Sequence, residues 1–280
     1  MTKQNNYKRN KVFDWGKLRK LHYFHQGKVW KKIEFNNWLK NPYTAFKSTF
    51  YIETSVLIVY FAQFTRITPN HLTFVYIIFG LVGGLFLASD NNFLIILSLF
   101  LFFIKGSFDW ADGLLARIKN QTSNLGNLLD HWGAKVGYLS FLIGFGYYLY
   151  NKNNEETFLF LIILIILLKA IDLKDYSYHL TMYEFMKDKN RKNFLNKLNF
   201  SKNNFSKKGF NPLVFLKNFF QNFVDDRARS IDLIMLLILI DNFYYELIFL
   251  KFIFYYISFK VLVIFLGGFY ATIFKKFLLK

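Results

Sequence analysis

The chain has 280 residues, 54% of them hydrophobic, and its 36 lysines and arginines against 18 aspartates and glutamates give a net charge of +18. A mean hydropathy of +0.20 is high for so basic a chain, so the charges must be separated from long apolar segments. The sequence has no cysteine, which excludes a disulfide scaffold and a cysteine-ligated zinc site.

The first part of the chain, residues 1–66, is basic, and we expect it to be cytoplasmic or interfacial. Within it, the stretch 44–66 is typical of an amphipathic helix that lies at a membrane interface. A proline and polar side chains follow at Pro69, Asn70 and Thr73, as is common where a helix begins.

Apolar runs then recur along the chain, each near the ~20 residues that a bilayer span needs. They lie at about 71–88, 93–108, 135–150, 157–173, 231–249 and 252–274. The fold class that they predict is all-α, an integral membrane bundle of about six transmembrane helices within residues 67–275, preceded by the interfacial helix. Lys105 interrupts one run and 243–274 can be divided differently, so five spans remain an alternative.

Cations gather in residues 1–50 and 186–208, whereas the short loops between them carry acidic residues. By the positive-inside rule, both termini and the polar insertion at 174–228 should be cytoplasmic. We expect this basic insertion to lie beside anionic membrane lipids and not to bind nucleic acid. The abundance of Phe, Lys, Asn and Ile resembles an AT-rich microbial genome, hence a microbial inner or plasma membrane.

An acidic motif stands at the end of the second apolar run. Asp109, Asp112, Gly113 and Ala116 are spaced i, i+3, i+4 and i+7, so they share one face of a helix. Carboxylates are costly in hydrocarbon and mark functional sites there. Asp130 can return from a second helix to the same site, and three carboxylates without cysteine favour magnesium or manganese.

The motif continues through Arg117 and Gly126 to Asp130, and as a whole it resembles the signature of the CDP-alcohol phosphotransferase family. The resemblance implies a multi-pass membrane transferase of phospholipid biosynthesis. The distribution of basic residues predicts that its active site faces the cytoplasm. Such an enzyme moves a phosphoalcohol or phosphatidyl group from a CDP-linked donor to the hydroxyl of an alcohol or lipid acceptor and releases CMP. It also implies a homodimer.

The resemblance assigns roles to the matched positions. Asp109, Asp112 and Asp130 would hold two divalent ions, and Arg117 would face phosphate or the nucleotide. Gly113, Ala116 and Gly126 would leave room for the cytidine. Asn70 and Thr73 would approach the nucleotide phosphates, although helix capping explains them equally well.

One position departs from the signature, because Ala134 stands where the family has a fourth aspartate. In the family that residue contributes to the metal site and takes the proton of the acceptor. His131 is the titratable candidate nearby, with a structural role as its alternative. Lys135, and Arg227 and Arg229 before the fifth span, suit a phosphate-bearing acceptor, although membrane topology also explains such cations.

Three functions are therefore open. The first is an active phosphotransferase. The second is a CDP-binding relative or variant whose catalysis is impaired by Ala134. The third is a membrane transporter or structural protein, which would carry its acidic residues near mid-bilayer. The clustering of the acids at one cytoplasmic edge argues against the third.

Overall fold

The computed structural model of the protein describes residues 12–29, 42–171, 228–244 and 248–274. In these ranges it contains eight α-helices and no strand, which confirms the prediction of an all-α protein. The chain divides into two compact units, residues 1–144 and 145–280. Each unit is described by itself.

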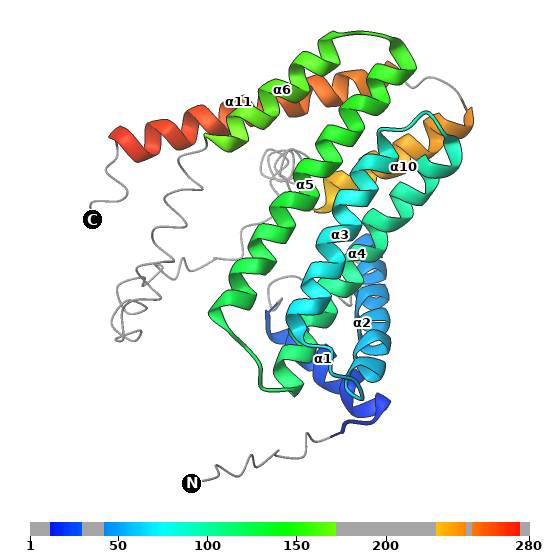
Figure 1. Ribbon diagram of the computed structural model, residues 1–280, viewed down its shortest axis with the longest axis vertical. Helices are drawn as coiled ribbons and strands as arrows, with labels where there is room; N and C mark the ends of the chain where they lie inside the picture. Colours follow the sequence, from blue (N-terminus) through cyan, green and yellow to red (C-terminus); the bar gives the residue numbers. More distant parts are fainter. Residues whose placement is uncertain (1–11, 30–41, 172–227, 245–247, 275–280) are drawn as a thin grey trace, which may run out of the picture. The chain divides into compact units, whose positions relative to one another are not determined.

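Five helices build the first unit. They are α1 (Trp15–Val29), α2 (Pro42–Ala62), α3 (Pro69–Leu87), α4 (Asn92–Ile118) and the beginning of α5 (Asn124–Asn153). Helices α3 and α4 run side by side, and α2 packs along α4 (Figure 1). The short α1 packs against α2.

Apolar side chains from four helices form one core beside the C-terminal part of α4. Burial of this surface is the main favourable contribution to the packing of α1 and α2 there. Its fully or nearly fully buried members are Leu18, Ile52, Val56, Val59, Ala62, Leu72, Ala111, Leu114 and Leu115. The core therefore holds the basic N-terminal segment against the helix that carries the acidic motif.

Glycines let α3 approach α5 at short range. A Cβ atom on Gly84 would lie 2.6 Å from the backbone oxygen of Ser140, and one on Gly80 would lie 3.0 Å from the Cα of Gly137. Small residues at such crossings allow helix backbones to come together in membranes. The contact fixes α5 beside α3 along the part of α5 that follows Asp130.

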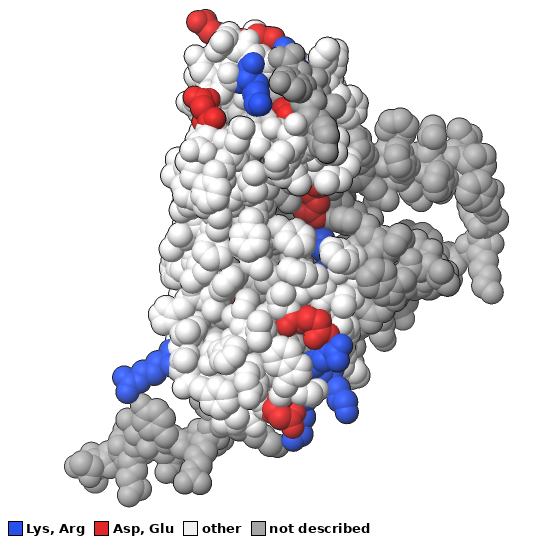
Figure 2. All heavy atoms as spheres, turned by 90° about the vertical axis from the view of Figure 1, so that its right-hand side faces the viewer, with Lys and Arg blue, Asp and Glu red and all other residues white. Residues whose placement is uncertain are grey.

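The outer face of α3 is apolar and exposed. Phe74, Ile78, Leu81 and Leu85 recur at helical spacing, and Leu85 is 72% exposed. On the surface in Figure 2, broad areas carry no Lys, Arg, Asp or Glu. An exposed apolar stripe on a helix of this length is what lipid contact requires.

Three of the described helices are long and apolar enough to cross a membrane, namely Pro69–Leu87, Asn92–Ile118 and Ile248–Tyr270. The apolar helices indicate a membrane protein, whereas six spans and the orientation remain predictions. Helix α4 continues ten residues beyond the expected end of its apolar run at 108. It does so because Ala111, Leu114 and Leu115 extend its buried face through the acidic motif.

The second unit contains the end of α5, α6 (Thr157–Ala170), α10 (Ala228–Tyr244) and α11 (Ile248–Phe274). Helices α6 and α11 lie side by side (Figure 1). Phe254 of α11 contacts the rings of Phe145 and Phe158 edge to face. The insertion expected at 174–228 lies outside the described residues apart from its last position.

Candidate active site

Asp112 is held inside the first unit by a hydroxyl from the neighbouring helix. Its side chain is buried, and Thr73 Oγ1 on α3 donates a hydrogen bond of 2.6 Å to Asp112 Oδ2. Thr73 is itself buried near the start of α3, where its hydroxyl also lies 3.3 Å from the Pro69 carbonyl oxygen. A charged acceptor strengthens such a hydrogen bond, so Thr73 orients the carboxylate.

Asp130 is oriented by the next residue on the same face of α3. The hydroxyl of Tyr76 donates to Asp130 Oδ1 at 3.1 Å and to the Asp130 carbonyl oxygen at 2.8 Å. Tyr76 is almost completely buried. Thr73 and Tyr76 are three residues apart, so adjacent hydroxyls of one helix face bind two carboxylates that come from α4 and α5.

Asp109 completes the group. It stands one turn before Asp112 on the same face of α4, and its charge interacts with that of Asp130. The charges of Asp109, Asp112 and Asp130 act on one another. The structure thus brings together the three aspartates that the sequence motif singles out, although Asp130 is distant from the other two in the chain.

The small residues of the motif border polar side chains. A Cβ atom on Gly113 would lie 3.4 Å from Arg117 Nη1, and one on Gly126 would lie 3.4 Å from Asn70 Oδ1. Asn70 and Gly126 therefore meet across α3 and α5. Ala116 is partly exposed on α4.

The connection between α4 and α5 is tied to the end of α2. Lys119 Nζ donates to the carbonyl oxygens of Thr65 at 3.0 Å and Ile67 at 2.7 Å. Asn120 follows with a φ of 53°, the left-handed conformation that asparagine tolerates. These contacts fix the turn through which the chain returns to Asp130.

The remaining expected site residues are exposed or partly exposed, or lie beyond the residues whose side chains are described. On α5, His131 and Ala134 are exposed and Lys135 is partly exposed. Arg227 lies outside the described residues, and of Arg229 only the backbone is described, in α10. Their roles remain proposals.

Two residues of the site, Tyr76 and Lys105, were not anticipated from the sequence as functional. Tyr76 follows Thr73 by one turn, and Lys105 precedes Asp109 by one turn in an apolar helix. A charged residue within such an apolar helix by itself indicates a functional site. In the sequence alone, Lys105 is visible only as an interruption of the apolar run.

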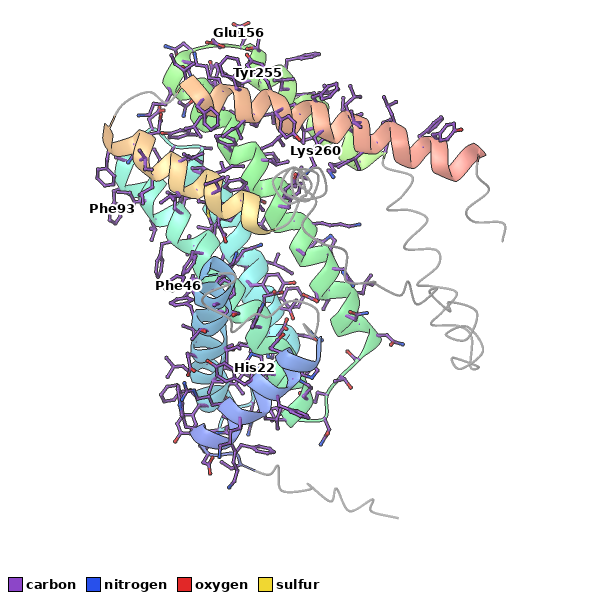
Figure 3. All side chains as sticks on the ribbon, turned by 180° about the vertical axis from the view of Figure 1, so that it is seen from behind. His22, Phe46, Phe93, Glu156, Tyr255 and Lys260 are labelled. Carbon is purple, nitrogen blue, oxygen red and sulfur yellow. The ribbon has the colours of Figure 1, made fainter. Side chains whose placement is uncertain are left out.

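A third unanticipated residue lies on α1, where Figure 3 labels His22. His22 is completely buried, its ring lies edge to face against Trp110 at 5.9 Å, and neither ring nitrogen has a hydrogen-bond partner. Burial, together with the nearby charge of Arg117, lowers the pKa of His22 to about 3. The imidazole is therefore neutral at physiological pH.

The donor set suits a hard cation, because it consists of carboxylate oxygens. Among the described residues, however, no three His, Cys, Asp or Glu side chains are grouped as the ligands of one ion. One oxygen each of Asp112 and Asp130 is already taken by a hydroxyl. The three carboxylates are the ligand type that a divalent cation prefers, but the described residues do not surround one ion position.

Comparison with protein families agrees with the motif. Residues 66–198 match the family model described as CDP-alcohol phosphatidyltransferase, which confirms the resemblance seen in the sequence. The matched segment begins just before α3 and contains all three aspartates. Enzymes of this family are generally divalent-metal dependent. No curated protein matches the chain.

Proposed function

We propose, from the family that residues 66–198 match, that the protein is a metal-dependent CDP-alcohol phosphotransferase. It would move a phosphoalcohol or phosphatidyl group from a CDP-linked donor to an acceptor hydroxyl and release CMP. The observation that carries the proposal is that Thr73 and Tyr76, one turn apart on α3, donate hydrogen bonds to Asp112 of α4 and Asp130 of α5. Asp109 stands one turn before Asp112 on the same helix face.

Three carboxylates whose charges act on one another need a counter-charge, because like charges near one another are disfavoured where water is scarce. Asp109, Asp112 and Asp130 would hold magnesium or manganese there. The bound cation would neutralise the donor pyrophosphate and stabilise the leaving CMP. Thr73 and Tyr76 would orient Asp112 and Asp130 for this role by donating to one oxygen of each carboxylate.

The small residues would admit the donor. Gly113 and Gly126 leave space beside Arg117 and Asn70, so a nucleotide could lie against the helix backbones. The guanidinium of Arg117 would bind a phosphate oxygen, which its planar donor arrangement suits. Thr73, expected to contact the nucleotide, would act through Asp112 instead.

In the transfer step, the acceptor oxygen forms a bond to the phosphorus that carries the donor alcohol. The bond from that phosphorus to the oxygen of CMP breaks, and CMP leaves with the bonding electrons. The hydroxyl proton must pass to a base, which Ala134 cannot be. We propose the exposed His131 for this role. Ala134 also favours a second candidate, a relative that binds CDP-linked donors with impaired turnover.

The remaining assignments follow the same proposal. Lys135, Arg227 and Arg229 would bind an acceptor that bears a phosphate. The site would face the cytoplasm, where soluble nucleotides are available, with membrane lipids around the helices. The chain would pair into a homodimer.

Calorimetry of CDP binding to the purified chain in detergent tests the proposal. Binding should require magnesium or manganese, because the three carboxylates would otherwise repel the pyrophosphate. Asp112→Ala and Asp130→Ala should each weaken the binding of CDP by more than ~100-fold. Losing a group that only orients a metal ligand typically costs ~10–100-fold, and these residues would be ligands themselves. Asp90→Ala, which removes an exposed aspartate of the same unit, should bind as the wild type does.

If CDP binds with the same affinity in the presence of a metal chelator as with magnesium or manganese, the assignment of the metal site is refuted. Full affinity in both Asp112→Ala and Asp130→Ala would place nucleotide binding elsewhere in the protein.

A further inference from the structure

His22 is a buried polar side chain that the proposed transfer reaction does not use. It lies on α1 (Figure 3), outside the segment 66–198 that matches the family, and it is completely buried. Among the described residues, neither nitrogen of its ring has a hydrogen-bond partner. A buried polar group without a partner destabilises the folded state, so packing alone would favour an apolar side chain at this position.

Arg117 carries a second group of this kind. Its Nε atom is buried and, within the described part of the chain, has no hydrogen-bond partner. The side chain runs back along α4, as long side chains in helices do, because its Nη1 and Cζ atoms would lie 3.4 Å and 4.0 Å from a Cβ atom on Gly113. The guanidinium therefore lies at the level of Gly113, and its charge interacts with Asp112.

The face of α4 that meets α1 brings the two groups near each other. The ring of His22 lies edge to face against Trp110, with the ring centres 5.9 Å apart. Trp110, Leu114 and Arg117 are spaced i, i+4 and i+7, so they share this face of α4. Leu114 and Leu18, one turn before His22, are buried in the same core. Because the guanidinium reaches back along this face, its charge acts on His22.

The two groups are chemically complementary. The Nε–H of a guanidinium can only donate a hydrogen bond, whereas a neutral imidazole, the form that His22 takes, has one nitrogen that accepts. A phosphate held by both Nη groups of Arg117 would leave the Nε–H as the remaining donor. The ring of His22 is then a neighbouring acceptor for that donor, and a hydrogen bond from a charged group is a strong one.

We propose that His22 is a positioning residue, whose ring accepts a hydrogen bond from Arg117 Nε when the Nη groups of Arg117 bind a phosphate of the CDP-linked donor. The inference rests on the proposed function. The new bond satisfies two buried groups at once, and a guanidinium that is already held loses less freedom when the donor binds. Helix α1 is then part of the donor site, although it lies outside the matched segment.

Calorimetry of CDP binding to the full chain in detergent, with magnesium present, tests the inference through a double-mutant cycle. His22→Leu should weaken CDP binding by ~10-fold or more, as expected for the loss of a hydrogen bond to a charged group. Arg117→Met should weaken it as well. Adding His22→Leu to Arg117→Met should cause no further loss, because His22 acts only through Arg117.

His22→Asn and His22→Gln separate positioning from packing. Their amide oxygens lie near the places of Nδ1 and Nε2 of the imidazole, so one of the two variants should recover most of the affinity that His22→Leu loses. The Tm of His22→Leu at pH 7 should not fall, because the substitution removes polar atoms that have no partner. A loss of CDP affinity in a variant that remains folded is therefore not a loss of structure.

His25→Leu is the matched control. It removes a histidine from the same helix, and His25 is partly exposed where His22 is fully buried. Its affinity for CDP should equal that of the wild type.

Four results would overturn the role of His22 and leave the proposed function intact. They are full CDP affinity in His22→Leu, a loss that persists undiminished together with Arg117→Met, a loss shared by both His22→Asn and His22→Gln, and an equal loss in His25→Leu. If the wild type does not bind CDP with magnesium or manganese, the proposed function fails, and the role of His22 fails with it.

Discussion

Polar side chains buried among apolar helices determine the shape of the site. Thr73 and Tyr76 each give a hydroxyl to a carboxylate on another helix. Each bond joins residues far apart in the sequence, so losing the hydroxyl would leave a carboxylate without its partner, which is more damaging than losing an exposed contact. These bonds link α3 to both helices that carry the aspartates.

The buried imidazole of His22 should make the protein sensitive to acid. Its pKa is about 3 in the folded protein against an ordinary value of 6.5. Between these values the unfolded chain binds a proton that the folded one does not, so stability falls as the pH drops below ~6.5. From pH 7 to pH 5 this histidine should account for a loss of about 2 kcal/mol.

Thermal unfolding in detergent at pH 7 and pH 5 measures this loss. His22→Leu should show a smaller fall in Tm than the wild type, whereas His131→Leu, which removes an exposed histidine, should behave as the wild type does. An equal fall in the wild type and His22→Leu would show that His22 is not the acid-sensitive group.

The residues of the site were predictable to different degrees. Asp109, Asp112 and Asp130 are recognisable from the sequence, because carboxylates are costly in hydrocarbon and are therefore rare in apolar segments unless they serve a function. The bond from Thr73 to Asp112 was not predictable, since it depends on how α3 lies against α4. Lys105 stands out in the sequence as a cation within an apolar helix. Its surroundings could not be predicted, because Gly137, which makes room for its ammonium group, lies on another helix.

At the scale of helices, close packing of α3 and α5 depends on glycine. Gly84→Ala would place a Cβ atom 2.6 Å from a backbone oxygen, and backbone cannot move aside as a flexible side chain can. We expect a loss of ~1–3 kcal/mol and a lower Tm. Gly267→Ala is the control, because no atom lies within 4 Å of the new Cβ.

A Tm in Gly84→Ala equal to that of the wild type would mean that α3 and α5 do not touch at Ser140. Lowered binding of CDP together with a lowered Tm would further indicate that this crossing holds Asp130 in place.

Helix positions agree with the sequence where apolar periodicity is strong. The first apolar run was expected at 71–88 and the helix spans Pro69–Leu87, and the interfacial stretch expected at 44–66 corresponds to Pro42–Ala62. Helix α1 was not predicted, because Leu18 and His22 are buried only through contact with other helices. Tertiary packing, not local pattern, defines it.

At the scale of the whole molecule, composition and apolar runs were sufficient for the all-α membrane class. They were not sufficient for the number of spans. Six spans were expected, whereas three of the described helices have the length and hydropathy that a span requires, and α6, which covers another expected span, has only 14 residues. They also gave no indication of two compact units that divide within α5. All three aspartates of the site fall in the first unit.

The central claim is that these aspartates serve a transfer reaction. Mass spectrometry of CMP and lipid products, from the chain supplied with CDP-diacylglycerol or CDP-alcohols, a divalent cation and acceptors, tests it most directly. We expect CMP release matched by a new phospholipid, with a ~10²–10⁴-fold lower rate in His131→Ala if His131 is the base. If the wild type releases CMP slowly and Ala134→Asp raises the rate, the protein is a relative whose turnover is impaired by Ala134. The account would be contradicted if neither the wild type nor Ala134→Asp released CMP from any of the donors, although both proteins were folded.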